Sequence, residues 1–275
     1  MELQILRFIQ HFKCDFLDVL FETISITAED FFIILLISAV LWIFNKKSGE
    51  FLAFSIISGL LFNCGIKNIF KLERPIGQEG IESERTHTAT GYSFPSGHTQ
   101  NSATLWTSLY LLFKKRALKI ILFILPFLTA LSRLYLGVHY PKDVVIGLLL
   151  GVAFSYLSLF LFNKFQNRTL LYCIVFLVSL LFIPFGLSED YVKTLGMFFG
   201  FILSSLFEKK FVNYDINVRL PKRFLRWFVG VIFIAIVYFA MKLTFPDNLG
   251  ADFLRYSILI FSALGIYPLA FRFIK

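Results

Sequence analysis

The segment Tyr92-Ser-Phe-Pro-Ser-Gly-His98, which leads directly into the apolar run 99–113, organises the rest of the chain. Its Pro-Ser-Gly triplet predicts a turn, and His98 falls in or beside the first turn of the helix that follows. The start of a helix presents unpaired N–H groups and the positive end of its dipole, which favour a bound anion. The Ser96 hydroxyl adds a donor, Gly97 lets the backbone approach closely, and a histidine exchanges protons near neutral pH. The segment therefore predicts a phosphate-sized anion site beside an acid–base residue, with a plain helix cap as the alternative.

The composition indicates an integral membrane protein with an all-α fold. Of the 275 residues, 57% are hydrophobic and only 16% are charged, and the mean hydropathy is +0.73. Soluble domains are about 45–50% apolar and about 25% charged. We expect a polytopic bundle of about nine transmembrane helices, because nine apolar runs approach, some only with their flanks, the roughly 20 residues that span a bilayer: 31–44, 51–69, 99–113, 120–131, 144–162, 170–186, 194–207, 228–241 and 256–271.

The distribution of charge predicts the orientation of this bundle. Sixteen of the 27 Lys and Arg residues fall in the loops on one side, and the other side carries a net negative charge. By the positive-inside rule the basic side is cytoplasmic, so the segment around His98 faces outward. The net charge of +9 then reflects topology and anionic lipid headgroups, and we expect membrane lipids but no nucleic acid as partners.

The N-terminal residues predict an amphipathic helix. Between residues 2 and 22, apolar side chains recur at helical spacing with charges between them, which favours a helix lying in the outer membrane interface. A packed, tilted element is the alternative. Because charges interrupt the apolar residues and no basic segment precedes them, we expect no signal peptide.

A second polar cluster, Lys67-x6-Arg74-Pro75, follows the apolar run 51–69. Lys67 and Arg74 are seven residues apart, so a continuous helix places both on one face, about 10 Å apart along its axis, with Lys71 between them. Pro75 is expected to end this helix. Snorkelling cations at the membrane boundary are the alternative. Topology alone does not explain basic residues on the acidic side, whereas an anionic ligand does.

The third polar cluster, Ser132-Arg133-x5-His139-x3-Asp143, connects the fourth and fifth apolar runs on the same outward side. Asp143 lies four residues after His139, so a helical turn brings its carboxylate to the imidazole, which it can orient and stabilise when charged. The alternative is a boundary Arg and His with Asp143 as the cap of the next helix, and the two roles are compatible.

Together the three clusters resemble the three-part signature of the type 2 phosphatidic acid phosphatase superfamily. Order and spacing match throughout: Lys, six residues, Arg-Pro; Pro-Ser-Gly-His; and Ser-Arg, five residues, His, three residues, Asp. The resemblance covers roughly residues 51–162. It says little about the N-terminal helix and the C-terminal spans. From the chain as a whole we expect a catalytic core of five spans in 31–165, preceded by the interfacial helix and connection of 1–30 and followed by a four-span extension, 166–275, of unknown role.

The resemblance also implies a role for each matching residue. His139 is expected to attack phosphorus and form a phosphohistidine, with Asp143 holding its imidazole in the reactive tautomer. His98 is expected to protonate the departing oxygen and then to activate water. The phosphoryl oxygens are expected to be bound by the remaining polar residues and glycine of the motifs, namely Lys67, Arg74, Arg133, Ser96 and Gly97.

Neither a metal nor a cofactor is expected. The sequence shows no carboxylate cluster suited to Mg²⁺, and the three motif cations serve instead. Cys14, Cys64 and Cys173 are scattered in apolar context, with neither disulfide nor metal spacing.

The implied function is that of a membrane-embedded lipid phosphatase, a phosphoric monoester or acid-anhydride hydrolase. We expect it in a bacterial inner membrane with its site on the periplasmic or extracellular side, where it suits a phosphate whose tail stays in the bilayer. Undecaprenyl pyrophosphate is the first expectation, on topology alone, and glycerolipid and lipid A phosphates also fit.

Two alternatives remain open, a phosphotransferase that uses the same phosphohistidine and a non-catalytic lipid-binding or transport protein. The intact His98, His139 and Asp143 argue against the second, since binding alone needs only the cations. For the last four spans, three roles are compatible with the sequence: packing against the core, a lipid-facing surface, or a homo-oligomer interface.

Overall fold

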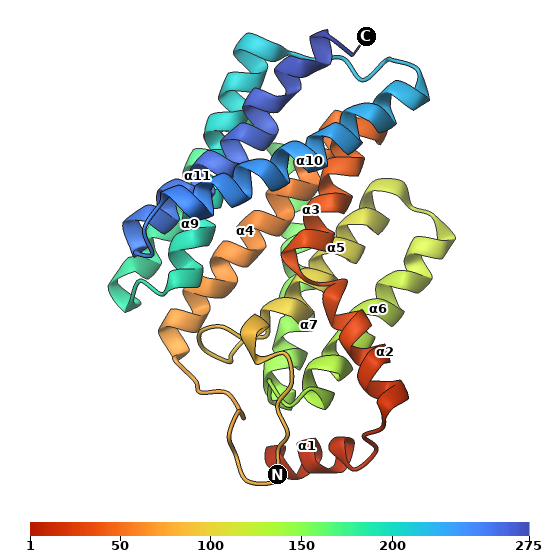
Figure 1. The fold of residues 1–275 in the computed structure, drawn as a ribbon, viewed down its shortest axis with the longest axis vertical. Coiled ribbons are helices and arrows are strands. Elements are labelled where there is room, and N and C mark those ends of the chain that lie inside the picture. Colours follow the sequence, from red (N-terminus) through yellow and green to blue (C-terminus); the bar gives the residue numbers. More distant parts are fainter. Residues whose placement is uncertain (275) are drawn as a thin grey trace.

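The fold is entirely helical across residues 1–274, which the computed structural model describes (Figure 1). Several helices continue without a break into a tighter or wider turn, labelled η. In chain order the elements are α1 Glu2–Gln10, α2 Asp15–Ile26, α3 Asp30–Ala39 with η1 Val40–Phe44, α4 Lys46–Phe70, η2 Thr86–Thr88, α5 Gly97–Phe113, α6 Arg116–Tyr135, α7 Pro141–Lys164, α8 Arg168–Ser179 with η3 Leu180–Phe185, α9 Glu189–Phe207 with η4 Glu208–Val212, α10 Leu220–Thr244, α11 Leu249–Phe261 with η5 Ser262–Ile266, and η6 Tyr267–Arg272.

Six of these helices are candidate membrane spans. They are long and apolar enough to cross a bilayer, and α2 with α3–η1, bent by 50° at their junction, makes a seventh if the pair is one span. Each of the nine apolar runs coincides with helical structure, apart from Gly186 at the end of the run 170–186, so the all-α expectation is confirmed. The count of nine spans stays a prediction, because α5 and α9 do not meet the same criteria of length and hydropathy.

The N-terminal prediction of one helix over residues 2–22 is wrong in one respect. The first helix, α1, ends at Gln10, and a second helix, α2, begins at Asp15. Tertiary contacts explain the break, because Gln10 Nε2 donates to the carbonyl oxygens of Glu82 (2.7 Å) and Tyr135 (2.9 Å), which holds α1 across the loop after α4. Beyond the break, α2 packs on α6, where the Phe21 and Tyr135 rings lie 4.6 Å apart.

The prediction of a helix that continues through Arg74 is also wrong. α4 ends at Phe70, and Lys71 takes a left-handed conformation (φ 50°, ψ 35°) with its N–H bonded to the carbonyl of Lys67. A residue before proline avoids the helical conformation, so the backbone leading into Pro75 favours a loop. Arg74 therefore extends from that loop, and Lys71 is exposed.

Helix α4 is the element shared by the two halves of the molecule. It runs between the group α5–α7 and the layer formed by α9, α10 and α11 (Figure 1). Aromatic side chains join the halves, because the Tyr172 ring of α8 packs on Phe54 of α4 (5.1 Å) and on Phe201 of α9 (4.9 Å). The core is therefore continuous from the motif-bearing helices into the C-terminal extension.

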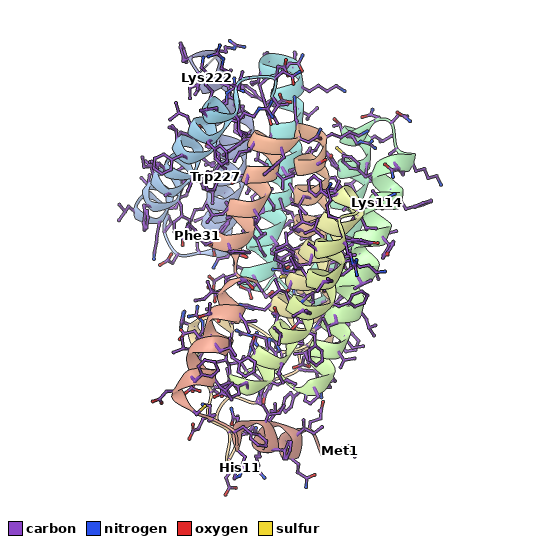
Figure 2. The ribbon with its side chains drawn as sticks, turned by 90° about the vertical axis from the view of Figure 1, so that its right-hand side faces the viewer. Met1, His11, Phe31, Lys114, Lys222 and Trp227 are labelled. Atoms are coloured by element: carbon purple, nitrogen blue, oxygen red, sulfur yellow. The ribbon has the colours of Figure 1, made fainter. Side chains whose placement is uncertain are left out.

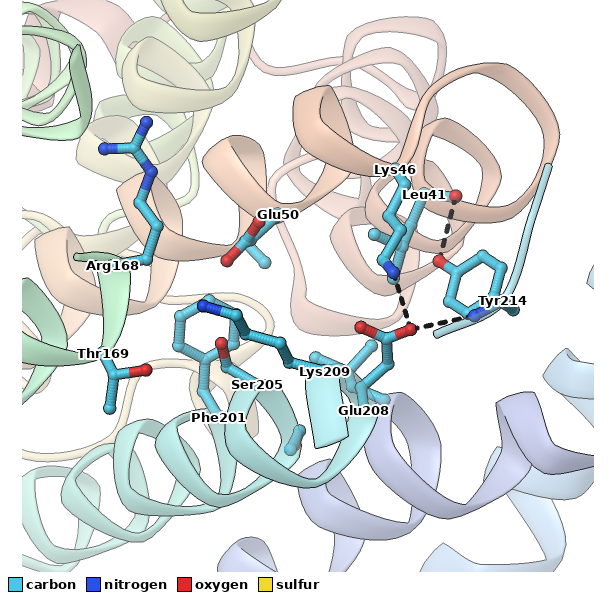
Figure 3. Close-up of a pocket in the computed structure, with 13 residues that line it drawn as sticks. Leu41, Lys46, Glu50, Arg168, Thr169, Phe201, Ser205, Glu208, Lys209 and Tyr214 are labelled. Carbon is cyan, nitrogen blue, oxygen red and sulfur yellow. Dashed lines mark hydrogen bonds and ion pairs between the residues drawn. The ribbon is translucent and has the colours of Figure 1, made fainter. Parts of the chain in front are cut away.

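The two ends of the molecule differ in character. Met1 and His11 lie at one end, whereas Lys222 lies at the other (Figure 2). At the end that carries the basic loops, a cavity of about 240 Å³ separates the start of α4 from α8 and α9 (Figure 3). One ion pair lines this cavity: Glu208 Oε1 lies 2.6 Å from Lys46 Nζ and also accepts the Tyr214 N–H. Since α4 has 25 residues, its two ends lie about 37 Å apart, and the polar motifs are at the far one.

Two glycines of α7 allow α5 to approach closely. A Cβ added at Gly147 would lie 2.8 Å from the Ser96 carbonyl oxygen, and one added at Gly151 would lie 2.6 Å from that of Gln100. Neither contact is tolerable for real side chains, so only glycine fits there. The close contact places the start of α5 directly against the first turns of α7.

We expect Gly151→Val to destabilise the protein by about 1–3 kcal/mol, because the added methyls must push α5 away from α7. Thermal unfolding in detergent measures the effect as a lower midpoint. Leu149→Val on the same helix is the control, since that side chain is 61% exposed. Equal midpoints for the two variants would contradict the close-contact explanation.

Candidate active site

The three polar clusters of the sequence meet in one buried site. Lys67 comes from the last turn of α4 and His98 from the first turn of α5, while Arg133 closes α6 and Asp143 opens α7. Arg133 and Asp143 are fully buried, and His139, in the turn between α6 and α7, is 1% exposed. A backbone hydrogen bond from Ser96 N–H to the Asp143 carbonyl (3.0 Å) ties the second cluster to the third.

The imidazole of His139 is held at both nitrogens. Nε2 lies 3.0 Å from Nη1 of Arg74, and Nδ1 faces Ser93 Oγ (3.3 Å) and Asp143 Oδ2 (3.4 Å). A guanidinium has only donors, so Nε2 must be the acceptor and the proton sits on Nδ1. Nε2 is therefore unprotonated, which is the form required of a nucleophile, and its lone pair accepts from Arg74 in the free protein.

Asp143 is fixed by more than its proximity to His139. Its Oδ2 accepts the Tyr140 backbone N–H (2.8 Å) and the Ser93 hydroxyl, as a cap at the start of α7. Since Ser93 donates its single proton to this carboxylate, its oxygen is free to accept the Nδ1–H of His139. Capping of the helix and orientation of the imidazole are thus combined in one side chain.

The electrostatic surroundings keep His139 neutral. Burial lowers the pKa of His139 well below its ordinary value of 6.5, and the positive charges of Arg74, Arg133 and Lys67 lower it further. A neutral imidazole at physiological pH follows from both causes. The cations responsible are the same three that the sequence motifs contain.

Arg74 is positioned by the carbonyl oxygens of two loops. Its guanidinium donates to Thr90 O (2.6 Å), Gly91 O (3.0 Å) and Val138 O (3.0 Å) besides its contact with His139. Burial lowers the pKa of Arg74 to about 10, which still leaves it charged near neutral pH. The Arg74 guanidinium is therefore a cation that is fixed in position on one side of His139.

Several polar atoms in the site have no partner among residues 1–274. Arg133 donates through Nη1 to Ser25 Oγ (2.7 Å), but its Nε and Nη2 are unpaired, as are His98 Nε2, Asp143 Oδ1 and Asn63 Oδ1. Unpaired buried polar groups are costly and rare in native proteins. The donors among them, beside three cations, suit a ligand with several oxygens and negative charge.

Ser96 and Gly97 begin α5. The Ser96 hydroxyl accepts the Thr99 N–H (3.5 Å) and lies 3.0 Å from the Thr99 hydroxyl, so the helix-cap alternative is realised in the structure. Gly97 lies close to Asn63, since an added Cβ there would be 3.6 Å from Asn63 Oδ1. The start of α5 thus faces the last turns of α4 across the site.

Three residues of the site were not singled out in the sequence. Ser93 lies within the segment Tyr92–His98, but nothing in its spacing assigns it a partner. Asn63 precedes Lys67 by one helical turn and shares its face, which is a usable signal. Ser25, from α2, has no sequence signal, because its contact with Arg133 joins residues 108 positions apart.

The chain matches two family models that together cover most of its length. Residues 50–169 match the PAP2 superfamily, and residues 192–275 match the PAP2 superfamily phosphatase transmembrane extension. The first range contains all three motifs, so the resemblance drawn from them is confirmed.

Curated relatives and a solved structure agree with these models. The chain is 41% identical over 78 residues to lipid A 4'-phosphatase of Bacteroides thetaiotaomicron, which is 28% of this chain and 35% of that protein. It is 30% identical over 136 residues to undecaprenyl-diphosphatase BcrC of Bacillus subtilis, 48% of this chain and 67% of that protein. The crystal structure of Aquifex aeolicus LpxE superposes with a TM-score of 0.51 at 29% identity, over 57% of this chain and 94% of that one. The match to the first relative thus spans only about a third of its length.

We expect the imidazole of His139 to titrate below pH 6.5, because burial and three cations disfavour its protonated form. Nitrogen-15 NMR of histidine-labelled protein in detergent measures the midpoint and shows which ring nitrogen carries the proton. Arg74→Gln should raise the midpoint, since one neighbouring positive charge is lost, and His139→Ala assigns the signal. A midpoint at or above 6.5 in the unsubstituted protein would overturn this account of the site.

Proposed function

The chain belongs to the PAP2 superfamily, and on that premise we propose that it is a membrane-embedded lipid phosphatase that works through a phosphohistidine at His139. The observation that carries this proposal is the unprotonated Nε2 of His139, which in the free protein accepts from Arg74, in a buried site that also holds the charges of Arg133 and Lys67. A binding protein needs the cations but has no use for an oriented, neutral imidazole. Hydrolysis of a phosphate ester or anhydride uses both.

The first step that we propose is attack of Nε2 on phosphorus. The phosphoryl group takes the place of the Arg74–His139 contact, so Arg74 then binds its oxygens together with Arg133 and Lys67. The N–P bond forms as the bond to the leaving oxygen breaks, and His98 protonates that oxygen. The proton on Nδ1 stays with Ser93 and Asp143, which stabilise the charge that develops on the ring.

The second step is hydrolysis of the phosphohistidine. His98, now neutral, takes a proton from water, the water oxygen attacks phosphorus, and the bond to Nε2 breaks. Inorganic phosphate leaves and His139 returns to its starting tautomer. The three cations neutralise the charge of the transition state, so the proposal assigns no step to a metal ion.

The proposed substrate is a lipid phosphate whose tail stays in the bilayer. The names of the relatives, a lipid A 4'-phosphatase and an undecaprenyl-diphosphatase, support this class, and we favour a polyprenyl pyrophosphate such as undecaprenyl pyrophosphate over a glycerolipid phosphate. Basic loops at the far end of the molecule support a site on the outer face of a bacterial inner membrane.

We further propose that the chain consists of a catalytic core and a C-terminal extension. Residues 31–165 form the catalytic core and 166–275 the extension, with α5 and α9 completing a set of nine spans. α5 qualifies because its polar residues, among them Gln100 and Ser108, are buried inside the protein and not exposed to lipid.

We expect purified protein to release phosphate from a lipid phosphate in detergent with EDTA present, and His139→Ala to abolish release. The panel is polyprenyl pyrophosphate, phosphatidylglycerol phosphate and phosphatidic acid, each with free phosphate measured over time. Release by the mutant, or loss of release on adding EDTA, would contradict the histidine mechanism. Phosphate recovered on an added lipid or sugar acceptor would favour a transferase.

Arg133→Lys should lower kcat/KM by about 10- to 100-fold, because an ammonium group cannot reproduce the two-pronged contact of a guanidinium with phosphoryl oxygens. Arg255→Lys in the extension is the matched control, since that arginine pairs with Asp247 and Asp252. Similar rates for both variants would show that Arg133 does not contact the reacting group.

A further inference from the structure

The C-terminal extension contacts the rim of the active site through the segment that begins α9. Asp190, in the first turn of α9, accepts a hydrogen bond from the Thr90 hydroxyl through Oδ2 (2.8 Å). A second contact lies beside it, because Asn68 of α4 donates to the Gly186 carbonyl (2.7 Å). These bonds join the extension to the core at the end of the molecule where His139 lies.

The loop that Asp190 contacts is the one that holds Arg74. The carbonyl oxygens of Thr90, Gly91 and Tyr92 lie 2.6, 3.0 and 3.3 Å from guanidinium nitrogens of Arg74. The direction of a guanidinium follows its acceptors, because its five donors lie in one rigid plane. A shift of this loop therefore changes the direction in which Arg74 points.

The loop and the carboxylate fit each other closely. Gly91 has a positive φ of 58°, and a Cβ added to it would lie 3.2 Å from Asp190 Oδ2. The backbone thus turns directly beneath the carboxylate, in a conformation that side chains rarely adopt. Thr90 is exposed, and its side-chain hydroxyl has Asp190 as its hydrogen-bond partner.

Charge adds to the contact. Burial disfavours the charged form of Arg74 and lowers its pKa. The negative charges of Asp190 and Asp143 act in the opposite direction and favour the charged guanidinium. Asp143 is also bound to Ser93 and Tyr140, whereas Asp190 belongs to a different part of the chain. One carboxylate from the core and one from the extension therefore offset the charge of Arg74.

We propose that Asp190 is a positioning residue for the reaction: through Thr90 it fixes the loop 90–92, whose carbonyls direct Arg74 at His139 and at the transferred phosphoryl group. This inference rests on the proposed function. It gives the extension a part in the active site beyond packing, and it places a residue that acts on Arg74 more than 20 positions outside the range of the first family model.

The test compares Asp190→Ala, Asp190→Asn and Thr90→Val in the full-length protein in detergent. We expect Asp190→Ala and Thr90→Val each to lower kcat by about threefold to tenfold, the value of one ordinary intramolecular hydrogen bond, because this bond lies at the exposed rim of the site. The double variant should lose little more than either single one, because both remove the same bond. Asp190→Asn retains an acceptor for Thr90, so it should recover most of the activity.

Hydrogen–deuterium exchange supplies a measurement that needs no substrate. Asp190→Ala and Thr90→Val should each raise the exchange of the peptide that covers residues 88–93, and leave α10 unchanged. Glu189→Ala is the matched control on the same turn, because that side chain is 65% exposed and pairs with Lys193. It should leave both kcat and the exchange of this peptide as they are.

The outcomes separate this inference from the proposed function. If the unsubstituted protein releases phosphate but Asp190→Ala matches Glu189→Ala in rate and in exchange, the positioning role is wrong and the phosphatase proposal stands. If no lipid phosphate is hydrolysed, the phosphatase proposal fails, and unchanged exchange at 88–93 overturns the contact itself. Should Asp190→Ala not fold, Thr90→Val decides the question, since it removes the same hydrogen bond from the core side.

Discussion

The structure depends on holding buried positive charge without a matching number of buried carboxylates. Arg74 contacts His139, the buried Lys67 and Arg133 add their charges to the same site, and a charge in a low-dielectric interior is expensive unless it is compensated. The protein compensates in part with neutral groups: loop carbonyls for Arg74 and the Ser25 hydroxyl for Arg133. An oxyanion would supply the compensation that is missing. The imbalance of charge that costs stability in the free protein would therefore favour binding of the phosphate group that we propose as ligand.

The rest of the fold keeps these charges close together. Glycines of α7 let α5 approach until Ser96 bonds to Asp143, so the second and third motifs share one backbone contact. Helix α4 carries Lys67 at one end. Along its length, aromatic side chains of α4 pack against α8 and α9 and so join the core to the extension. A rigid shared helix explains how a residue at the start of α9 lies within reach of the loop that holds Arg74.

The position of the ring proton of His139 determines which groups can contact each of its two nitrogens. Because Arg74 can only donate, Nε2 must accept, and Nδ1 must then find an acceptor on its other side. Ser93 and Asp143 both meet that need, and Asp143 is itself held by a backbone N–H of the turn. The tautomer is thus a property of the assembled network and not of any single pair, which is why a serine without a recognised role in the motif takes part in it.

The amino-acid sequence by itself determined that the chain is a helical membrane protein and which polar motifs belong to its family, because hydropathy and motif spacing are local properties of the chain. The apolar runs coincide with helices, and contacts join the three motifs at one site. Only the tertiary structure decided where helices end and which neutral groups serve the charges. The break between α1 and α2, the left-handed turn at Lys71 and the contacts of Ser25 and Asp190 all depend on partners distant in sequence. Such contacts have no periodicity, so their energy is decided only when distant segments have been brought together.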